Sequence, residues 1–141
     1  FAGMKNFMQN LFLIHSAVSF FLLLICGASC EAGDYRVRKT ADGIAFDIAI
    51  NRNPPVLGDN EISIEIRDPQ GSPVLDAEVL VNYYMPPMPK MAPMNYTIPA
   101  PLKGKEYRAV MDLIMTGPWI IVARARIQGK WVRVTFPIDV R

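Results

Sequence analysis

Methionine recurs at every third position of one short, proline-rich segment: Met85, Met88, Met91 and Met94. Proline fixes the backbone angle φ near its polyproline II value, and a polyproline II helix repeats every three residues. The spacing therefore predicts a stiff, extended segment with four thioethers along one edge. Because thioether sulfur is a soft ligand that favours Cu(I) over hard cations, the segment is a candidate Cu(I) site.

The same methionines have a second interpretation, which needs no metal. Methionine is a flexible apolar side chain that fills irregular gaps and serves adaptable contact surfaces. A methionine/proline loop across the mouth of a β-sandwich would show the same spacing, either packing there or docking a partner. Met115 is a further thioether at the end of an expected strand. It either joins the four as a ligand or fills the end of the sandwich, and both alternatives stay open.

An apolar segment near the N-terminus predicts export of the rest of the chain. Residues 11–26, LFLIHSAVSFFLLLIC, follow a lysine and precede three small residues. This order of charge, apolar stretch and small residues is typical of a secretory signal. The sequence predicts a signal peptide or an N-terminal membrane anchor over residues 1–32, and an exported domain over residues 33–141.

Cys30 leaves the processing of that segment open. The residues before it, Gly27-Ala28-Ser29, partly resemble a lipobox, although the aliphatic residue expected at Gly27 is missing. Lipidation of Cys30 and simple cleavage near Ala28 or Ala32 are both predicted outcomes, beside an uncleaved anchor. Each of them places the domain in the cell envelope, secreted into the periplasm or anchored to the membrane through the N-terminal segment.

The residue types missing from residues 33–141 exclude several kinds of site. Both cysteines and the single histidine, His15, precede this range, so it lacks the ligands of ordinary zinc and blue-copper sites. It also lacks a Cys or His nucleophilic dyad and a Gly-rich phosphate loop, so we expect no enzymatic activity. A net charge of +2, without a basic cluster interleaved with aromatics, argues against a nucleic-acid partner.

Apolar and polar residues alternate through most of the exported domain, as in strands with one buried face. Trp119 begins one strictly alternating apolar row, and we expect it to anchor the core. Six such rows occur, beginning at Ile44, Ile62, Ala77, Tyr107, Trp119 and Val132.

Turn residues separate these rows, and no helical periodicity follows the N-terminal segment. Typical turn sequences are Asp42-Gly43, Asp68-Pro-Gln-Gly71 and Gln128-Gly129. The chain is therefore predicted to be an all-β, immunoglobulin-like antiparallel β-sandwich of about seven strands. Its longest connection is expected from Met85 to about Lys105, and a long loop of this kind is more often functional than accidental.

An ordered set of motifs resembles a known family. It comprises Asn53-Pro-Pro-Val-Leu-Gly-Asp-Asn60, Ile62-x-Ile64-x-Ile66-x-Asp68-x-x-Gly71-x-Pro73-Val74-x-x-Ala77-x-Val79, Met85-Pro-x-Met88, Tyr107-x-Ala109 and Met115-x-Gly117-x-Trp119. The set resembles the YtkA-like domain, a small secreted or membrane-anchored β-sandwich similar to the periplasmic part of FixH-type proteins. The resemblance implies an envelope module associated with heavy-metal, especially copper, handling.

One departure from the family pattern narrows the metal hypothesis. YtkA-like domains commonly have a histidine shortly after the methionine pair, whereas Lys90, Met91 and Met94 occupy that stretch here. A Cu(II) site would use imidazole, so the departure leaves an all-thioether Cu(I) site.

Two functional hypotheses follow for this non-enzymatic envelope module. In the first, the four methionines bind Cu(I) transiently and pass it to an envelope protein partner, such as a metal transporter or a cuproprotein assembly factor. In the second, no metal is involved, and the methionine/proline loop is the docking surface for another envelope protein.

Overall fold

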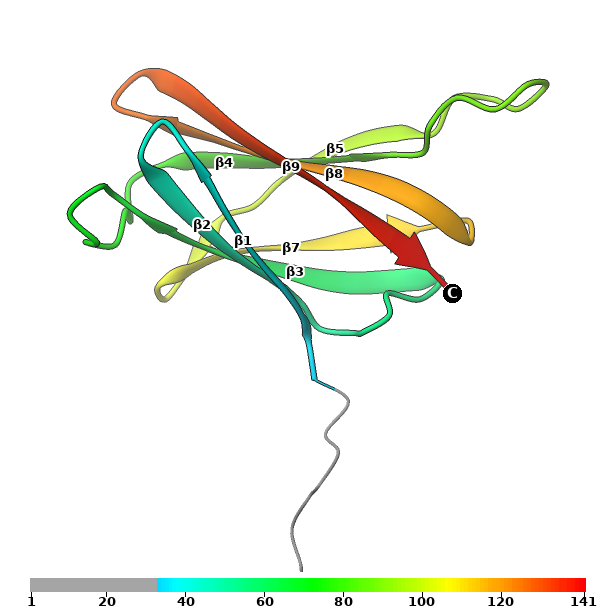
Figure 1. The fold of residues 1–141 in the computed structure, drawn as a ribbon, viewed down its shortest axis with the longest axis horizontal. Helices are drawn as coiled ribbons and strands as arrows, with labels where there is room; N and C mark the ends of the chain where they lie inside the picture. The colour runs from blue at the N-terminus through cyan, green and yellow to red at the C-terminus, as the bar shows by residue number, and fades with distance from the viewer. Residues whose placement is uncertain (1–32) are drawn as a thin grey trace, which may run out of the picture. The chain divides into compact units, whose positions relative to one another are not determined.

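The alternating rows form the strands of two antiparallel β-sheets in a computed structural model, which describes residues 33–141 (Figure 1). The predicted all-β, immunoglobulin-like sandwich is confirmed. Its strands are β1 (Tyr35–Ala41), β2 (Ile44–Ile50), β3 (Gly58–Arg67), β4 (Glu78–Tyr84), β5 (Asn95–Pro99), β6 (Leu102–Lys103), β7 (Glu106–Leu113), β8 (Gly117–Ile127) and β9 (Lys130–Val140).

The strands divide between a five-stranded sheet, in the order β1-β2-β3-β7-β6, and a four-stranded sheet, in the order β5-β4-β8-β9. The inner faces of the two sheets share one apolar core, because every second side chain of a strand points the same way. Trp119 on β8 is 0 % exposed, which confirms it as a core anchor. The largest side chains buried with it are Tyr107, Phe46 and Phe136.

The described residues hold nine strands, and the prediction of about seven missed β5 and β6. The single long connection expected from Met85 to about Lys105 is therefore wrong, because these two strands interrupt it. Both lie at sheet edges and expose most of their side chains. An edge strand without a buried face shows no apolar alternation, so the sequence contained no signal for it.

The predicted turns form as expected. Asp42 and Gly43 have φ of 52° and 77°, and both residues of the Gln128-Gly129 turn also have positive φ. Two such residues in a row make the tight hairpin turn whose twist matches the twist of the flanking strands. The Asp68 carboxylate accepts hydrogen bonds from the amides of Gln70 and Ser72 at 3.0 and 2.9 Å, which closes the third turn.

The described strands pair with one another and surround a core of their own. We therefore expect a polypeptide of residues 33–141 to fold by itself. Within these residues no helix is long and apolar enough to cross a membrane. The predictions for the N-terminal signal or anchor, for His15, for cleavage near Ala28 or Ala32 and for lipidation of Cys30 lie outside the described residues.

Candidate soft-metal site

The methionine run forms a hairpin loop between β4 and β5, which we name the methionine hairpin (Met85–Met94). At its base the Met85 amide donates to the Met94 carbonyl at 3.1 Å. This bond continues the ladder beyond Tyr84 and Asn95, which face each other on β4 and β5. The hairpin projects past the ends of both strands (Figure 1).

A tight turn closes the tip of the hairpin. The Met91 amide donates to the Met88 carbonyl at 3.3 Å, across Pro89 and Lys90. Lys90 has a φ of 65°, and a proline followed by a residue of positive φ is the arrangement of a type II turn. Non-glycine residues seldom adopt such a φ, so Lys90 holds the reversal at a local conformational cost.

These two backbone bonds arrange the methionines in pairs: Met85 lies across from Met94 at the base, and Met88 lies across from Met91 at the tip. The predicted extended segment, with four thioethers along one edge, is therefore wrong. Proline restricts φ at single residues, but the two strands that hold the ends of the segment force a reversal between them. The reversal at Lys90 replaces the line of methionines by two facing pairs.

One cavity of about 290 Å³ collects all four predicted ligands. No ionisable acid or base other than a tyrosine lines it, and most of its lining is apolar. The lining residues are Tyr84, Met85, Pro86, Pro87, Met88, Met91, Ala92, Pro93, Met94 and Asn95. Tyr84 and Asn95 were not predicted as site residues, because their place follows from the β4–β5 register, and β5 has no alternation that would reveal it.

The base and the tip of the hairpin differ in burial. Met85 is 6 % exposed, and Met94 is half-buried against the core. Met88 and Met91 are 39 % and 40 % exposed. The base is thus part of the sandwich, whereas the tip is open to a ligand or a partner.

Met115, the fifth candidate ligand, does not line this cavity. It lies in the β7–β8 turn, half-buried against the core, and its carbonyl accepts a hydrogen bond from the indole Nε1 of Trp119 at 2.8 Å. The base of the hairpin approaches the start of β8, since the terminal methyl of Met85 is 3.5 Å from where a Cβ on Gly117 would stand. Met115 is thus two residues from a neighbour of Met85 but is not among the residues that line the hairpin cavity.

An aromatic cluster supports the base of the hairpin from inside the sandwich. The ring of Tyr83 is 5.3 Å from the ring of Tyr96 and 6.0 Å from that of Trp119, between centroids. Such tilted pairs add stability beyond the area they bury. Burial raises the pKa of the Tyr83 phenol above its ordinary value of 10.0, because the charged form would lose its hydration.

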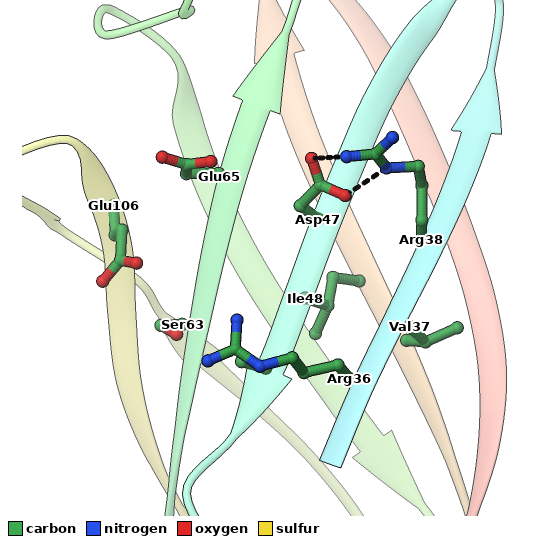
Figure 2. A pocket seen from close by; sticks show the side chains of 9 residues that line it. Arg36, Val37, Arg38, Asp47, Ile48, Ser63, Glu65 and Glu106 are labelled. Carbon is green, nitrogen blue, oxygen red and sulfur yellow. Dashed lines mark hydrogen bonds and ion pairs between the residues drawn. The ribbon is translucent and has the colours of Figure 1, made fainter. Parts of the chain in front are cut away.

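A second hollow, of about 400 Å³, lies on the outer face of the five-stranded sheet (Figure 2). Its charged residues come from four strands, and two of them are joined: Arg38 forms a two-pronged ion pair with Asp47. This hydrogen bond to Asp47, followed by the Asp47 charge, raises the pKa of Arg38. Glu65 and Glu106 pair outside the hollow, with Arg67 and Arg108. No three Asp, Glu, His or Cys side chains within residues 33–141 gather so as to hold a metal ion.

The sequence model of the YtkA-like family matches residues 38–123 of this chain. This chain belongs to the YtkA-like family. The match begins in β1, ends in β8 and contains all five methionines considered as ligands. The resemblance drawn from the sequence motifs is confirmed.

Among solved structures, the soluble domain of PmoD from Methylocystis sp. ATCC 49242 (Rockwell) is similar to this chain. The crystal structure of that domain superposes with a TM-score of 0.54 at 12 % identity, over 74 % of this chain and 96 % of that one. At this identity the likeness shows a common fold alone. No curated protein matches the chain.

Proposed function

We propose that this YtkA-like protein is a non-enzymatic module of the cell envelope that binds Cu(I) through the methionine hairpin. The observation that carries the proposal is the gathering of four thioethers around one cavity by two backbone hydrogen bonds, of 3.1 Å at the base and 3.3 Å at the tip.

The donor set of the hairpin fits a soft, singly charged ion. Thioethers are neutral, so they stabilise Cu(I) without the negative charge that Mg²⁺ or Ca²⁺ requires from its ligands. The hairpin cavity contains no carboxylate that would favour a hard cation. The nearby cation Lys90 opposes binding of any positive ion, which favours weak, reversible capture over permanent storage.

Transient capture suits transfer to a partner. The tip methionines are exposed, so a stronger ligand on another envelope protein reaches an ion there by exchanging one thioether at a time. A metal transporter or a cuproprotein assembly factor has the chemistry of such a partner. An envelope location is supported by family membership and by the signal-like apolar segment over residues 11–26.

The test is a Cu(I) competition titration of residues 33–141 under reducing conditions. We expect Cu(I) and Ag(I) to bind and Zn(II) and Mg(II) not to bind. Replacing the four hairpin methionines by Leu keeps size and apolarity, so binding should be lost while folding changes little. Met111→Leu, a fully buried methionine on β7, is the matched control and should bind like the parent.

Two further variants divide the hairpin. Met88→Leu with Met91→Leu removes the tip pair, and Met85→Leu with Met94→Leu removes the base pair; each should fall between the parent and the fourfold variant. Because neutral thioethers release no proton on binding, the affinity should also be nearly constant between about pH 5 and 8. Parent-like affinity in the fourfold variant would refute the metal proposal.

A metal-independent docking function is the second candidate, favoured by the exposed tip and the apolar lining of the cavity. Exposed methionines adapt to varied apolar partners. If neither the parent nor the fourfold Leu variant binds Cu(I), and both retain the same envelope partner, docking is the better assignment, since Leu preserves the apolar surface.

A further inference from the structure

Two arginines face each other on the outer face of the four-stranded sheet. Arg124 on β8 and Arg133 on β9 are directly opposite in the strand register. Like charges in this position repel each other and destabilise a strand pair. The pair is therefore expected to destabilise the β8–β9 hairpin, and no structural role for it is evident.

Neither arginine has an acidic partner among residues 33–141. The neighbouring cations on this sheet are neutralised: Arg126 forms an ion pair with Glu78, and Lys130 lies 3.4 Å from Asp42. Asp42 is the one acidic residue that lines a hollow beside the arginine pair. Its ion pair with Lys130 leaves the two guanidinium groups as the uncompensated charge of this face.

The Nε atom of Arg124 adds a second, independent observation. It is buried and has no hydrogen-bond partner in the protein. A buried donor on a charged group is expensive to leave unpaired, and most such atoms in proteins have a partner. An oxyanion in a neighbouring hollow would not reach this enclosed atom, but it would pair with the outer N–H donors of the same guanidinium and supply the counter-charge that the group lacks.

The surroundings offer room and an aromatic edge. A hollow of about 490 Å³ lies on one side of the pair and another of about 420 Å³ on the other. Trp131 lines the first hollow, is 46 % exposed, and stacks against Arg126 with 5.7 Å from the guanidinium carbon to the ring centroid. A tetrahedral oxyanion has enough oxygens to engage both arginines, and such bidentate recognition is what arginine does better than lysine.

We propose that Arg124 and Arg133 form a binding site for a phosphate-type oxyanion on the outer face of the β4–β8–β9 sheet. The proposal does not rest on the metal proposal, although one of the two hollows shares Tyr84 and Asn95 with the hairpin cavity. Its ligand is either free phosphate or the phosphate of an anionic lipid headgroup, because both present the same oxygens to the two guanidinium groups.

The experiment uses residues 33–141 at low ionic strength, where exposed charges are least screened. The probes are inorganic phosphate, vesicles of phosphatidylglycerol mixed with phosphatidylcholine, and vesicles of phosphatidylcholine alone. Trp131 fluorescence reports binding at the site, and the fully buried Trp119 supplies a constant background. Vesicle co-sedimentation and the midpoint of thermal unfolding are the second readouts.

The test variant is Arg124→Gln with Arg133→Gln, and the control is Arg36→Gln with Arg52→Gln, which removes the same charge at exposed positions elsewhere. We expect the test variant to bind at least about tenfold more weakly than the parent, and the control to bind within about twofold of it. The single variant Arg133→Gln, at an exposed position, keeps the test valid if loss of Arg124 disturbs folding.

The arms of the experiment separate the two sources of the oxyanion. Saturable binding of inorganic phosphate that depends on the two arginines supports the site with a free ligand. Binding to phosphatidylglycerol vesicles alone, with the same dependence, supports it with a lipid headgroup. Absence of both, or equal losses in the test and control variants, overturns the proposal, because the effect would then be absent or due to net charge.

Discussion

The hairpin cavity and the hollow on the five-stranded sheet differ in whether their polar or charged groups already have partners within the protein. The hollow is larger, at about 400 against 290 Å³, but its charged side chains are matched within the protein, as Arg38 is with Asp47. The hairpin cavity carries thioethers, two of them exposed, whose preferred partner is a soft ion or an apolar surface. Cavity volume alone is thus a poor guide to function, because charged groups that are already paired within the protein gain little by binding a ligand.

The two regions also differ in how they are built. The hairpin base belongs to the core, through Met85 and the aromatic cluster around Tyr83, whereas the hollow is an arrangement of surface side chains on strands. Changes at the base should therefore cost stability, and changes in the hollow should not.

The largest loss is expected for Trp119→Ala. This change removes a fully buried ring, its contact with Tyr83 and its hydrogen bond to the Met115 carbonyl. Large-to-small changes of this kind cost about 3–5 kcal/mol, through lost burial and the cavity left behind. Denaturant unfolding measures the loss, and a value well below about 1 kcal/mol would show that the hairpin end does not depend on the core.

The two levels of the hairpin should respond differently to the same substitution. Met85→Ala removes a buried side chain at the base and should cost about 2–4 kcal/mol. Met88→Ala changes an exposed tip residue and should alter the free energy of unfolding by less than about 0.5 kcal/mol. Thermal or denaturant unfolding of the two variants makes the comparison, and equal losses would contradict the division into base and tip.

A smaller effect is expected at high pH. Burial raises the pKa of Tyr83 and of Tyr107 above the ordinary value of 10.0. Because the folded pKa lies above the unfolded one, the stability gained from the protonated phenols is complete below pH 10 and is lost as the pH rises through the folded values.

Phenylalanine at either position removes the titration. We therefore expect Tyr83→Phe and Tyr107→Phe to flatten the alkaline part of the stability profile, measured by urea unfolding between about pH 8 and 11. Tyr107→Phe should also lower stability at neutral pH by about 1 kcal/mol or more, since its hydroxyl donates to the Val74 carbonyl at 2.8 Å and accepts from the Ala77 amide at 3.1 Å. An unchanged alkaline slope in both variants would contradict the role of the phenols.

The smallest effect is expected in the hollow. Arg38→Gln breaks the ion pair with Asp47, yet the arginine lies at the surface, where water and salt screen the charges. Unfolding of this variant should resemble that of the parent, and salt should reduce any difference that remains. A loss of unfolding free energy as large as that of Met85→Ala would show that the hollow contributes to stability as much as the hairpin base does, which would contradict the prediction.

Much of the fold was predictable because period-two alternation depends on local chemistry alone. Trp119, the Asp42-Gly43 turn and the hairpin of β8 and β9 were placed correctly, since each is specified by neighbouring residues. β5 and β6 were missed because their side chains are mostly exposed, so neither has the alternating buried face that reveals the edge strand β9.

The sequence predicted which methionines gather at the candidate site, but the extended backbone that it predicted for them was wrong. The four methionines were identified by type and spacing, and the structure brings them to one cavity. Their polyproline geometry was overridden because β4 and β5 pair on either side of the segment and force it to reverse. The facing arginines are a different case: the Gln128-Gly129 turn fixes the β8–β9 register that sets Arg124 opposite Arg133, but only the packed structure shows that the Arg124 Nε is buried without a partner.

By itself, then, the sequence determined which strands have a buried face, where the turns of positive φ lie, and that residues 33–141 offer a metal ion neither thiolate nor imidazole. These are properties of residue type and local spacing. The tertiary structure alone decided which methionines face each other, which of them are buried, and which arginines are left without a counter-charge. The facing residues follow from the registers of the β4–β5 and β8–β9 hairpins, whereas burial and the missing counter-charges follow from packing against strands distant in the chain.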